Sequence, residues 1–428
     1  MLRFSEDGQV LNEDEYSAIL VGLELNEDIS YSMKELEGLA EAANVDVEAI
    51  MVQHLERPNN ATFIGKGKVE ELADLAAKLE VDTVIFNDEL TGVQIRNLED
   101  ATGKRVIDRT ILILDIFAAR ASSKEGKLQV ELAQLQYRMP RLTGFGNSLS
   151  RLGGGIGTRG PGEKKLETDK RHIRRRIDDI RAELKEIKST RETQRSRRVK
   201  NEIPLVALVG YTNSGKSAIM NRLMSITDKD EKMVFEKDML FATLDTAQRN
   251  VVLDSNHQFI LIDTVGFVSK LPHSLVNAFK STLEEVCYAD LLVHVVDAAY
   301  DNHEFQIEVT DKVIKEIGAG DKEKIIAYNK CDLIREEDET LLPRYGCDTV
   351  YVSAKEGRNI DELIEQIKSK IYKNHVIADL LIPYSRGDLS SYLCEKASVN
   401  VMEYRDDGTF FNAELKLEDY NRYKEFEI

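Results

Sequence analysis

Residues 210–217 constrain the fold of this chain more than any other stretch, because they read Gly-Tyr-Thr-Asn-Ser-Gly-Lys-Ser between two informative flanks. The apolar run Ile203–Val209 before them has strand length, and Ala218–Leu223 after them can continue as a helix. In this strand, loop and helix context, glycines let backbone N–H groups point at phosphate oxygens. The pattern predicts a P-loop that binds a nucleotide through Gly210, Tyr211, Thr212, Asn213, Ser214, Gly215, Lys216 and Ser217.

Two side chains of this loop are predicted to carry most of its chemistry. Lys216 can reach the β and γ phosphates, and the Ser217 hydroxyl can ligate Mg²⁺. A glycine turn that only mimics the pattern is the alternative, but a chance match in a chain of this length is on the order of one in a hundred. The flanking strand and helix lower that chance further.

Length and composition indicate a protein of several domains. With 428 residues, the chain is expected to hold roughly two to four domains. Its acidic first residues, 1–7, are followed by no apolar run long enough to cross a bilayer, so we expect a cytoplasmic protein without a membrane span. The oligomeric state that we expect is a monomer.

Cysteine and histidine spacing predicts no metal site. The four cysteines show no C-x-x-C spacing and are expected to be reduced thiols: Cys287, Cys331, Cys347 and Cys394. His294 lies in an apolar run and His303 in a polar segment, so the histidines are expected to be structural or on the surface.

The net charge of −18 is unevenly distributed along the chain. Residues 120–200 carry 22 lysines and arginines against 10 acidic residues, so the basic middle is set in an acidic remainder. A localised basic segment is what contact with nucleic-acid phosphates requires, although a solvated helical face gives the same composition. Charge alone leaves both readings open.

The first hundred residues alternate short apolar runs with amphipathic stretches, which is typical of a small α/β domain. The expected strands are Ala18–Leu25, Ala49–His54, Val81–Phe86 and Val106–Ile107. The expected helices include Met33–Ala43, Val69–Leu79 and Gln94–Leu98. Residues 65–68, Gly-Lys-Gly-Lys, are interpreted as the entry to a helix rather than as a second phosphate loop.

Two further helices are predicted to pack as an antiparallel hairpin. Apolar residues recur at helical spacing in both: Leu128, Leu132, Leu135 and Met139, then Ile173, Ile177, Ile180, Leu184 and Ile187. The glycine-rich connection 144–162 can hardly form a core. It and its edges carry the candidate RNA contacts Arg141, Arg151, Arg159, Lys164 and Lys165, and we favour a segment that becomes ordered on RNA over an inert linker.

Further polar motifs follow the P-loop in the order that a GTPase requires. At the end of the run Phe259–Ile262, the first motif consists of Asp263, Thr264, Val265 and Gly266. Asp263 can hold Mg²⁺ through water, and the Gly266 amide can contact the γ-phosphate. Upstream lie Phe241, Ala242 and Thr243, of which Thr243 can ligate Mg²⁺ while the γ-phosphate is present, as a switch does. The predicted catalytic residues are Lys216, Thr243 and Gly266.

The remaining two motifs predict a guanine pocket. One consists of Asn329, Lys330 and Asp332, and its carboxylate can accept from guanine N1 and N2 together. The other consists of Ser353, Ala354 and Lys355 after the run Thr349–Val352. Each motif alone is weak, but together in this order they predict that the chain binds GTP and GDP.

Phe267 follows Gly266, where Ras-type GTPases place a glutamine that orients the attacking water. Phenylalanine cannot do this, so hydrolysis is expected to be slow alone and to be completed by a monovalent cation or by a partner that orders the switches. Asn213 resembles the asparagine of potassium-activated GTPases, but asparagine in this loop can equally stabilise the turn. Both readings, and hence K⁺ as a cofactor, stay open.

Longer strings make the chain resemble the HflX family of the Obg-HflX group over nearly its whole length. They are residues 63–68, 108–117, 126–135, 151–163 and 271–276. Two positions depart from the family pattern: Lys164 stands where threonine is usual, and Thr246 where proline is usual. The second departure bears on switch flexibility.

The resemblance implies a ribosome-associated GTPase. Members bind the large subunit, separate stalled or idle ribosomes under stress, and use their amino-terminal and helical domains to reach ribosomal RNA near the peptidyl transferase centre. By analogy, GTP binding sets affinity and ribosome-accelerated hydrolysis releases the factor. Alternatives are a GTPase that regulates protein partners, or an RNA remodelling factor with a second nucleotide site in the amino-terminal domain.

The predicted fold class is α/β, with a P-loop GTPase domain whose mostly parallel sheet has helices on both faces. We expect an α/β domain at 1–118, a basic helical hairpin at 119–202, the GTPase domain at 203–373 and a small α+β unit at 374–428. In the last unit, Val399–Met402 and Phe411–Leu417 flank the turn signal Asp407-Gly408.

Overall fold

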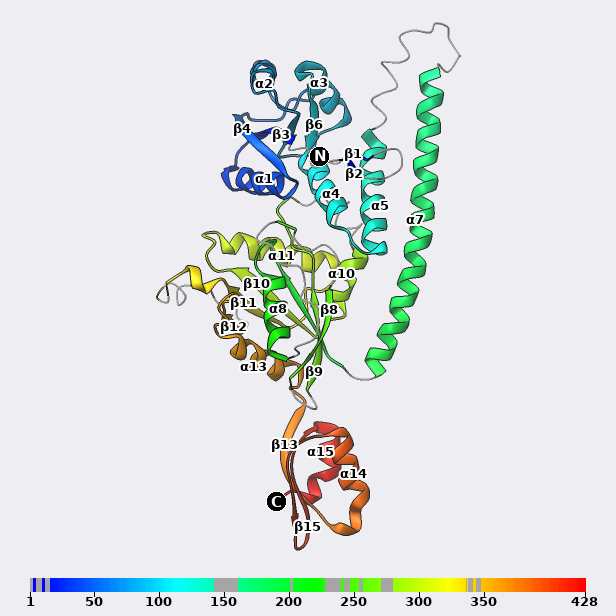
Figure 1. Cartoon of the computed structure of the whole chain (residues 1–428), viewed down its shortest axis with the longest axis vertical. Coiled ribbons are helices and arrows are strands. Elements are labelled where there is room, and N and C mark those ends of the chain that lie inside the picture. The colour runs from blue at the N-terminus through cyan, green and yellow to red at the C-terminus, as the bar shows by residue number, and fades with distance from the viewer. Residues whose placement is uncertain are drawn as a thin grey trace.

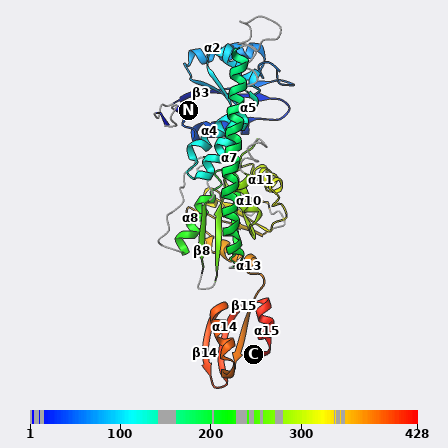
Figure 2. The same cartoon turned by 90° about the vertical axis from the view of Figure 1, so that its right-hand side faces the viewer.

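The computed structural model describes residues 3–4, 10–11, 16–141, 161–200, 203–227, 240–241, 247–253, 257–270, 280–335, 337, 342–343 and 348–428. Three main sheets follow one another along the molecule, and the long helix α7 runs beside the first two (Figures 1 and 2). A short antiparallel pair, β1 (Arg3–Phe4) with β2 (Val10–Leu11), precedes them in the chain.

The first sheet is parallel and has the strand order β4-β3-β5-β6. Its strands are β3 (Tyr16–Glu24), β4 (Val45–His54), β5 (Thr83–Phe86) and β6 (Arg105–Asp108). The helices between and after them are α1 (Ser30–Ala42), α2 (Lys66–Lys78), α3 (Gly92–Thr102) and α4 (Arg109–Arg120). Gly65 is the residue before α2, so residues 65–68 form a helix entry as predicted.

Strand β3 supplies both faces of this sheet because successive side chains point to opposite sides. Ala18 and Leu20 belong to the core that α1 and α4 cover. Ile19 and Val21 belong to the core that α2 and α3 cover. The four helices therefore bury both faces of the parallel sheet.

Helices α5 (Lys124–Arg141) and α7 (Pro161–Lys200) pack along one seam. Leu128 and Leu132 meet Ile177 and Ile180 there, in a cluster that also contains the other apolar residues predicted for the seam. Ion pairs join Glu131 to Arg176 (2.6 Å) and Glu125 to Arg191 (2.7 Å), so the two helices are antiparallel. The predicted hairpin is confirmed.

The second sheet has the order β12-β11-β10-β7-β9-β8 and is parallel except for β8. Its strands are β7 (Leu205–Gly210), β8 (Ala247–Val252), β9 (Gln258–Asp263), β10 (Leu291–Asp297), β11 (Lys324–Asn329) and β12 (Asp348–Tyr351). Two helices pack on one face, α8 (Lys216–Thr227) and α13 (Ile360–Ile371). The other face is covered by α10 (Lys280–Cys287) and α11 (His303–Ile317). This is the predicted mostly parallel sheet with helices on both faces.

The third sheet is antiparallel, with the order β13-β15-β14. Its strands are β13 (His375–Ile382), β14 (Ser398–Arg405) and β15 (Gly408–Lys416), and its helices are α14 (Gly387–Lys396) and α15 (Leu417–Tyr423). Arg405 pairs with Gly408, which confirms the predicted hairpin and places its turn at Asp406 and Asp407, one residue earlier than predicted. The short helices η3 (Cys331–Leu333), η4 (Tyr384–Arg386) and η5 (Lys424–Phe426) complete the described elements, and the predicted fold class is confirmed.

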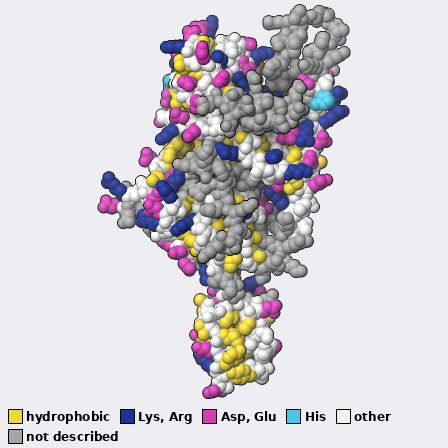
Figure 3. All heavy atoms as spheres, viewed as in Figure 1, with side chains coloured by type: hydrophobic (Ala, Val, Ile, Leu, Met, Phe, Trp, Pro, Cys, Tyr) yellow, Lys and Arg dark blue, Asp and Glu magenta, His cyan; other side chains and the backbone are white. Residues whose placement is uncertain are grey.

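The molecular surface in Figure 3 mixes acidic and basic side chains over the first two sheets, whereas hydrophobic side chains gather over part of the third. Large exposed hydrophobic side chains of the third unit include Ile377, Tyr384 and Tyr404. Among the described helices, none is both long and apolar enough to cross a membrane.

Candidate nucleotide site

The loop between β7 and α8 requires glycine at two positions. A Cβ atom on Gly210 would lie 2.2 Å from the Val295 carbonyl oxygen, and one on Gly215 would lie 2.1 Å from Asn329 Nδ2. Gly215 also has φ +89°, and Asn213 has φ +60°. A left-handed backbone of this kind is tolerated by asparagine better than by most residues, which matches the turn-forming reading of Asn213.

Lys216 lies at the start of α8 and is buried. Its Nζ donates to the carbonyl oxygens of Gly210 (3.1 Å) and Tyr211 (2.8 Å), so the ammonium is held over the loop. Burial lowers the pKa of Lys216 to about 8, against the opposing charge of Asp263. A cation held in this place suits the binding of phosphate oxygens.

Ser217 and Asp263 meet beside this lysine. Ser217 Oγ donates to Asp263 Oδ2 (2.5 Å), and burial raises the pKa of Asp263, while Lys216 opposes that effect. Asp263 Oδ1 is buried with no hydrogen-bond partner among the described residues. An orphaned carboxylate oxygen next to a serine hydroxyl is an oxygen donor set of the kind that Mg²⁺ prefers.

The segment after β9 is laid directly against the P-loop. Thr212 N donates to the Phe267 carbonyl (2.7 Å), and Phe267 N donates to the Gly210 carbonyl (3.2 Å). A Cβ atom on Gly266 would lie 2.6 Å from Thr212 Cα, so only glycine fits this approach. Thr264 Oγ1 donates to the Leu208 carbonyl (2.7 Å), and Val265 is buried.

Phe267 itself is buried in the core between the sheet and helices α10 and α11. Phe241 lies beside the P-loop, because its backbone amide donates to Thr212 Oγ1 (2.9 Å). The side chain of Phe267 therefore packs as a hydrophobic residue and offers no polar group to an attacking water.

The two motifs predicted for the guanine pocket converge with the P-loop. Asn329 Nδ2 donates to the Ser214 carbonyl (2.9 Å), and Asn329 Oδ1 accepts from Ala354 N (3.0 Å). Ser353 Oγ donates to Asp332 Oδ1 (2.7 Å), which orients that half-buried carboxylate. Lys330 pairs with Asp297 (2.8 Å), and Lys355 is exposed. One asparagine thus connects three loops that lie far apart in the sequence.

The P-loop and the segment after Gly266 also contact the first sheet through buried polar side chains. Glu35 of α1 accepts from the Tyr211 hydroxyl and from Ser269 Oγ, and it forms an ion pair with Arg109. Ser269 N donates to the Tyr211 hydroxyl (2.8 Å). Burial, with the charge of Glu35 beside it, raises the pKa of Tyr211 well above its usual range, so the hydroxyl remains a donor.

Arg109 completes this interdomain network, which consists of Ser32, Glu35, Asn87, Arg109, Tyr211 and Ser269. Its Nη1 donates to Asn87 Oδ1 (3.1 Å) and to the Ser32 carbonyl (3.3 Å), and all six residues are buried. Asn87 and Arg109 directly follow β5 and β6, so the network lies at the carboxyl end of the first sheet. In an open parallel sheet, this is the edge where a nucleotide would bind. Tyr211 and Ser269 cover it here, which argues against the second nucleotide site considered as an alternative.

Two contacts outside this network also join the segment after Gly266 and the segment that contains Phe241 to the first domain. Lys270 pairs with Asp88 (2.6 Å). The rings of Phe241 and Phe117 meet edge to face with their centroids 4.7 Å apart. Both stretches that were predicted to sense the γ-phosphate therefore touch the amino-terminal α/β unit.

Known proteins match the chain along nearly all of its length. The family descriptions are "GTP-binding GTPase N-terminal" over residues 30–118, "GTP-binding GTPase Middle Region" over 120–198 and "50S ribosome-binding GTPase" over 205–330. A "GTPase HflX" from Caldanaerobacter subterraneus subsp. tengcongensis is 48% identical over 418 residues, which cover 98% of this chain and 95% of the relative. The chain belongs to the HflX GTPase family.

A second HflX protein and one solved structure are also similar to the chain. The "GTPase HflX" of Escherichia coli (strain K12) is 37% identical over 413 residues, which cover 95% of each chain. A solved structure described as "crystal structure of SsGBP and GDP complex" is 26% identical, covers 84% of this chain and 99% of that one, and superposes with a TM-score of 0.48. As an HflX protein the chain is a GTP hydrolase, and its family is one of ribosome-binding GTPases.

Some residues predicted for the nucleotide site and for the RNA contacts lie outside the described part of the chain. Ala242, Thr243, Arg151 and Arg159 lie outside it, as do the side chains of Lys164 and Lys165. Arg141 is described, and its guanidinium donates to the carbonyls of Leu90 (2.9 Å) and Tyr137 (3.0 Å). Because these internal acceptors engage it, we remove Arg141 from the proposed RNA contacts.

The sequence did not predict that Glu35, Arg109 and Ser269 form the interdomain network beside the nucleotide site. Arg109 stands between the apolar stretches Val106–Ile107 and Ile111–Ile113, a position where an arginine has to be paired if it is buried. That signal indicates a buried partner without indicating which residue it is.

The orientation of Asp332 predicts the base specificity of this HflX protein. We expect Asp332→Asn to lower GTP affinity by about 10²-fold, because guanine N1–H and N2–H₂ lose a charged acceptor. Xanthine carries an oxygen in place of the N2 amine, so the variant should bind xanthosine triphosphate better than the wild type does. Fluorescent-nucleotide titration measures both affinities, and an unchanged GTP affinity would remove Asp332 from the base pocket.

Proposed function

We propose that this HflX protein is a GTP-controlled factor that binds the large ribosomal subunit and separates stalled or idle ribosomes under stress. The observation that carries this proposal is the match of residues 205–330 to the description "50S ribosome-binding GTPase", within similarity to HflX proteins over 98% of the chain. The four ranges 1–118, 119–202, 203–373 and 374–428 are the domains that we propose for it.

The phosphate chemistry is assigned to the P-loop and the residues packed against it. Lys216 would bind the β and γ phosphates, and Ser217 and Thr243 would hold Mg²⁺, with Asp263 acting through water. The buried, orphaned Oδ1 of Asp263 beside Ser217 supports this assignment. Mg²⁺ held there would supply positive charge to the phosphates during hydrolysis. Asp332 and its neighbours select guanine.

Hydrolysis is slow until a partner completes the site. Phe267 is buried in the core, so a group from elsewhere must orient the attacking water. The large subunit supplies this effect by ordering the segments around Thr243 and Gly266. A potassium ion near Asn213 is the second candidate source of activation. Comparison of hydrolysis rates in matched potassium and sodium buffers distinguishes activation by K⁺ from activation by the large subunit.

GTP affects the rest of the molecule through the interdomain network. Ser269 lies three residues after Gly266 in the same segment. A movement of Gly266 toward the γ-phosphate therefore also moves Ser269. Ser269 is bonded to Glu35 and Arg109, so its displacement changes how the amino-terminal unit is held. The nucleotide state thereby sets the orientation in which the α/β unit and the hairpin meet the ribosome.

The hairpin supplies the RNA contacts. Arg171, Arg174 and Arg175 of α7 are exposed and form no ion pair with another described residue. They continue the basic character of the connection with Arg151, Arg159, Lys164 and Lys165. Lysines and arginines of this kind bind phosphates and release counterions, so their affinity falls steeply with salt.

Sedimentation with purified large subunits tests this proposal. We expect the protein to pellet with the subunits when bound to a non-hydrolysable GTP analogue, and to bind about tenfold or more weakly with GDP or after a change from 50 to 200 mM salt. Changing Arg171, Arg174 and Arg175 together to Ala should weaken binding, whereas the same change at the paired Arg181 should not. Equal pelleting with both nucleotides would contradict the switch.

A further inference from the structure

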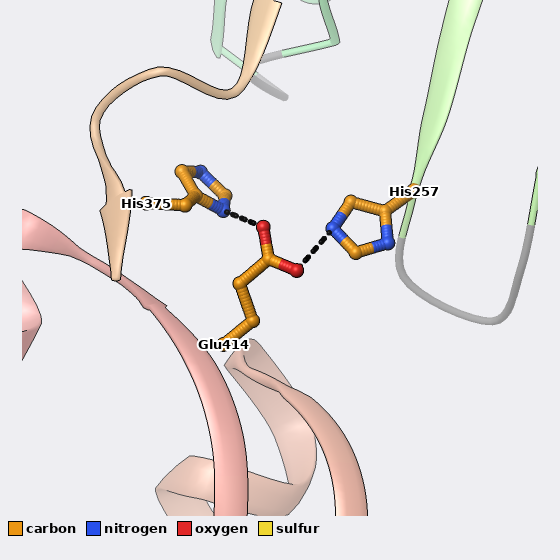
Figure 4. A group of neighbouring side chains, drawn as sticks. All are labelled: His257, His375 and Glu414. Carbon is orange, nitrogen blue, oxygen red and sulfur yellow. Dashed lines mark ion pairs between the residues drawn. The ribbon is translucent and has the colours of Figure 1, made fainter. Parts of the chain in front are cut away.

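Two histidines and a glutamate converge where the second sheet meets the third. His257 directly precedes β9, His375 begins β13, and Glu414 lies on β15. Glu414 Oε2 lies 3.1 Å from His257 Nε2, and its Oε1 lies 3.5 Å from His375 Nδ1. Figure 4 shows both rings directed at the carboxylate, one toward each oxygen. One ligand atom from each of the three residues lies within 4.8 Å of the other two.

The two rings are held in place by their surroundings. Tyr372 packs edge-on against both, with centroid distances of 4.8 Å to His257 and 4.9 Å to His375. Its hydroxyl donates to the Gln258 carbonyl (2.8 Å) and accepts from Gln258 N (3.1 Å). His257 is 2% exposed. A ring orientation fixed before binding reduces the entropy that a ligand must overcome.

The donor set indicates which ions fit. Imidazole nitrogen suits zinc and other late transition metals, and two histidines with one glutamate form a known zinc ligand set, whereas magnesium and calcium prefer oxygen donors alone. At zinc–ligand distances near 2.0–2.1 Å, tetrahedral donors lie about 3.3 Å apart. The observed separations of 3.1 and 3.5 Å run from the two rings to different oxygens of Glu414, and one ligand atom from each residue lies within 4.8 Å of the others, so the side chains need only small shifts to reach that spacing.

We propose that His257, His375 and Glu414 bind one zinc-class divalent ion, with a fourth position left for water. The ion joins the β8–β9 end of the GTPase sheet to the carboxyl-terminal sheet and fixes their relative orientation. The sequence-based prediction of structural or surface histidines is revised at this point. This proposal does not rest on ribosome binding, and the site lies outside the nucleotide pocket.

Titration of the tag-free, full-length protein with Zn²⁺, in excess Mg²⁺ and with GDP bound, tests the site. We expect one equivalent to bind, and His257→Gln and Glu414→Gln each to weaken binding by about tenfold or more. His303→Gln removes a histidine that contacts the Tyr300 carbonyl elsewhere and serves as the matched control. Co²⁺ in place of Zn²⁺ should give the visible absorption bands of a tetrahedral site in the wild type and in His303→Gln only.

His375→Gln changes the more exposed of the two rings and keeps the test decisive if His257→Gln fails to fold. Guanine-nucleotide affinity reports on folding in every variant. The proposal is overturned if the wild type binds no stoichiometric Zn²⁺, or if folded His375→Gln and Glu414→Gln bind it as tightly as the wild type.

Discussion

Replacement of Arg109 by methionine should lower the free energy of unfolding of the amino-terminal unit by about 3–5 kcal/mol, the cost of removing one partner from a buried ion pair. Glu35 would remain buried against Tyr211 and Ser269 without its cation. Urea unfolding followed by far-ultraviolet circular dichroism measures this change, because the chain has no tryptophan to report by fluorescence.

Arg105→Met is the matched control, since Arg105 belongs to the neighbouring β6 and is exposed. Surface changes of this type are usually within about 0.5 kcal/mol of the wild type. The double variant Glu35→Leu, Arg109→Met should recover part of the loss, because no buried charge is left unpaired. If Arg109→Met unfolds at the same urea concentration as wild type, the interdomain network is not a stabilising contact.

Replacement of Lys216 by alanine should lower kcat for GTP hydrolysis by about 10²–10³-fold or more. The variant loses a preorganised donor that stabilises negative charge on the phosphates in the transition state. The structure supports a large effect because Lys216 Nζ is held by two P-loop carbonyls and is buried. Lys315→Ala, on the exposed face of α11, serves as the control. Single-turnover phosphate release is the readout, and a rate within threefold of wild type would exclude Lys216 from the chemistry.

Local patterns in the sequence predicted much of the fold. The P-loop was recognisable because its glycines and its flanks are neighbours in the chain, and the structure shows close backbone approaches at Gly210 and Gly215. The hairpin seam was predicted because leucines and isoleucines repeat at helical spacing, and those residues form the cluster between α5 and α7. Both signals depend on residues close in sequence.

Element ends were harder to predict. Strand β4 begins at Val45 rather than at Ala49, because it lies at the sheet edge and alternates exposed acids with apolar residues. Helix α7 extends from Pro161 to Lys200, far beyond the predicted Ile173–Ile187. Its ends were missed because they are rich in charged and polar residues and carry no apolar period. Charged helix ends give no periodic signal, although they are compatible with helix.

Individual side-chain contacts between segments distant in the sequence were mostly not predicted. Glu35 and Tyr211 share no local sequence pattern. The same holds for His257, which precedes β9, and Glu414, which lies on β15. The guanine pocket is an exception in part: its residues were predicted because the order of motifs is informative, whereas the hydrogen bond from Asn329 to the Ser214 carbonyl that connects them was not. Tertiary structure supplies these pairs.

The measurement that tests the central claim most directly is GTP hydrolysis with and without purified large ribosomal subunits, at matched potassium and sodium concentrations. Wild type is compared with a variant in which Arg151, Arg159, Lys164 and Lys165 are changed together to Ala. We predict that the subunits stimulate the wild type and that the variant loses the stimulation while keeping its basal rate. An unchanged rate with subunits in either cation would contradict ribosome activation, and a fully stimulated variant would contradict the RNA role of the basic connection.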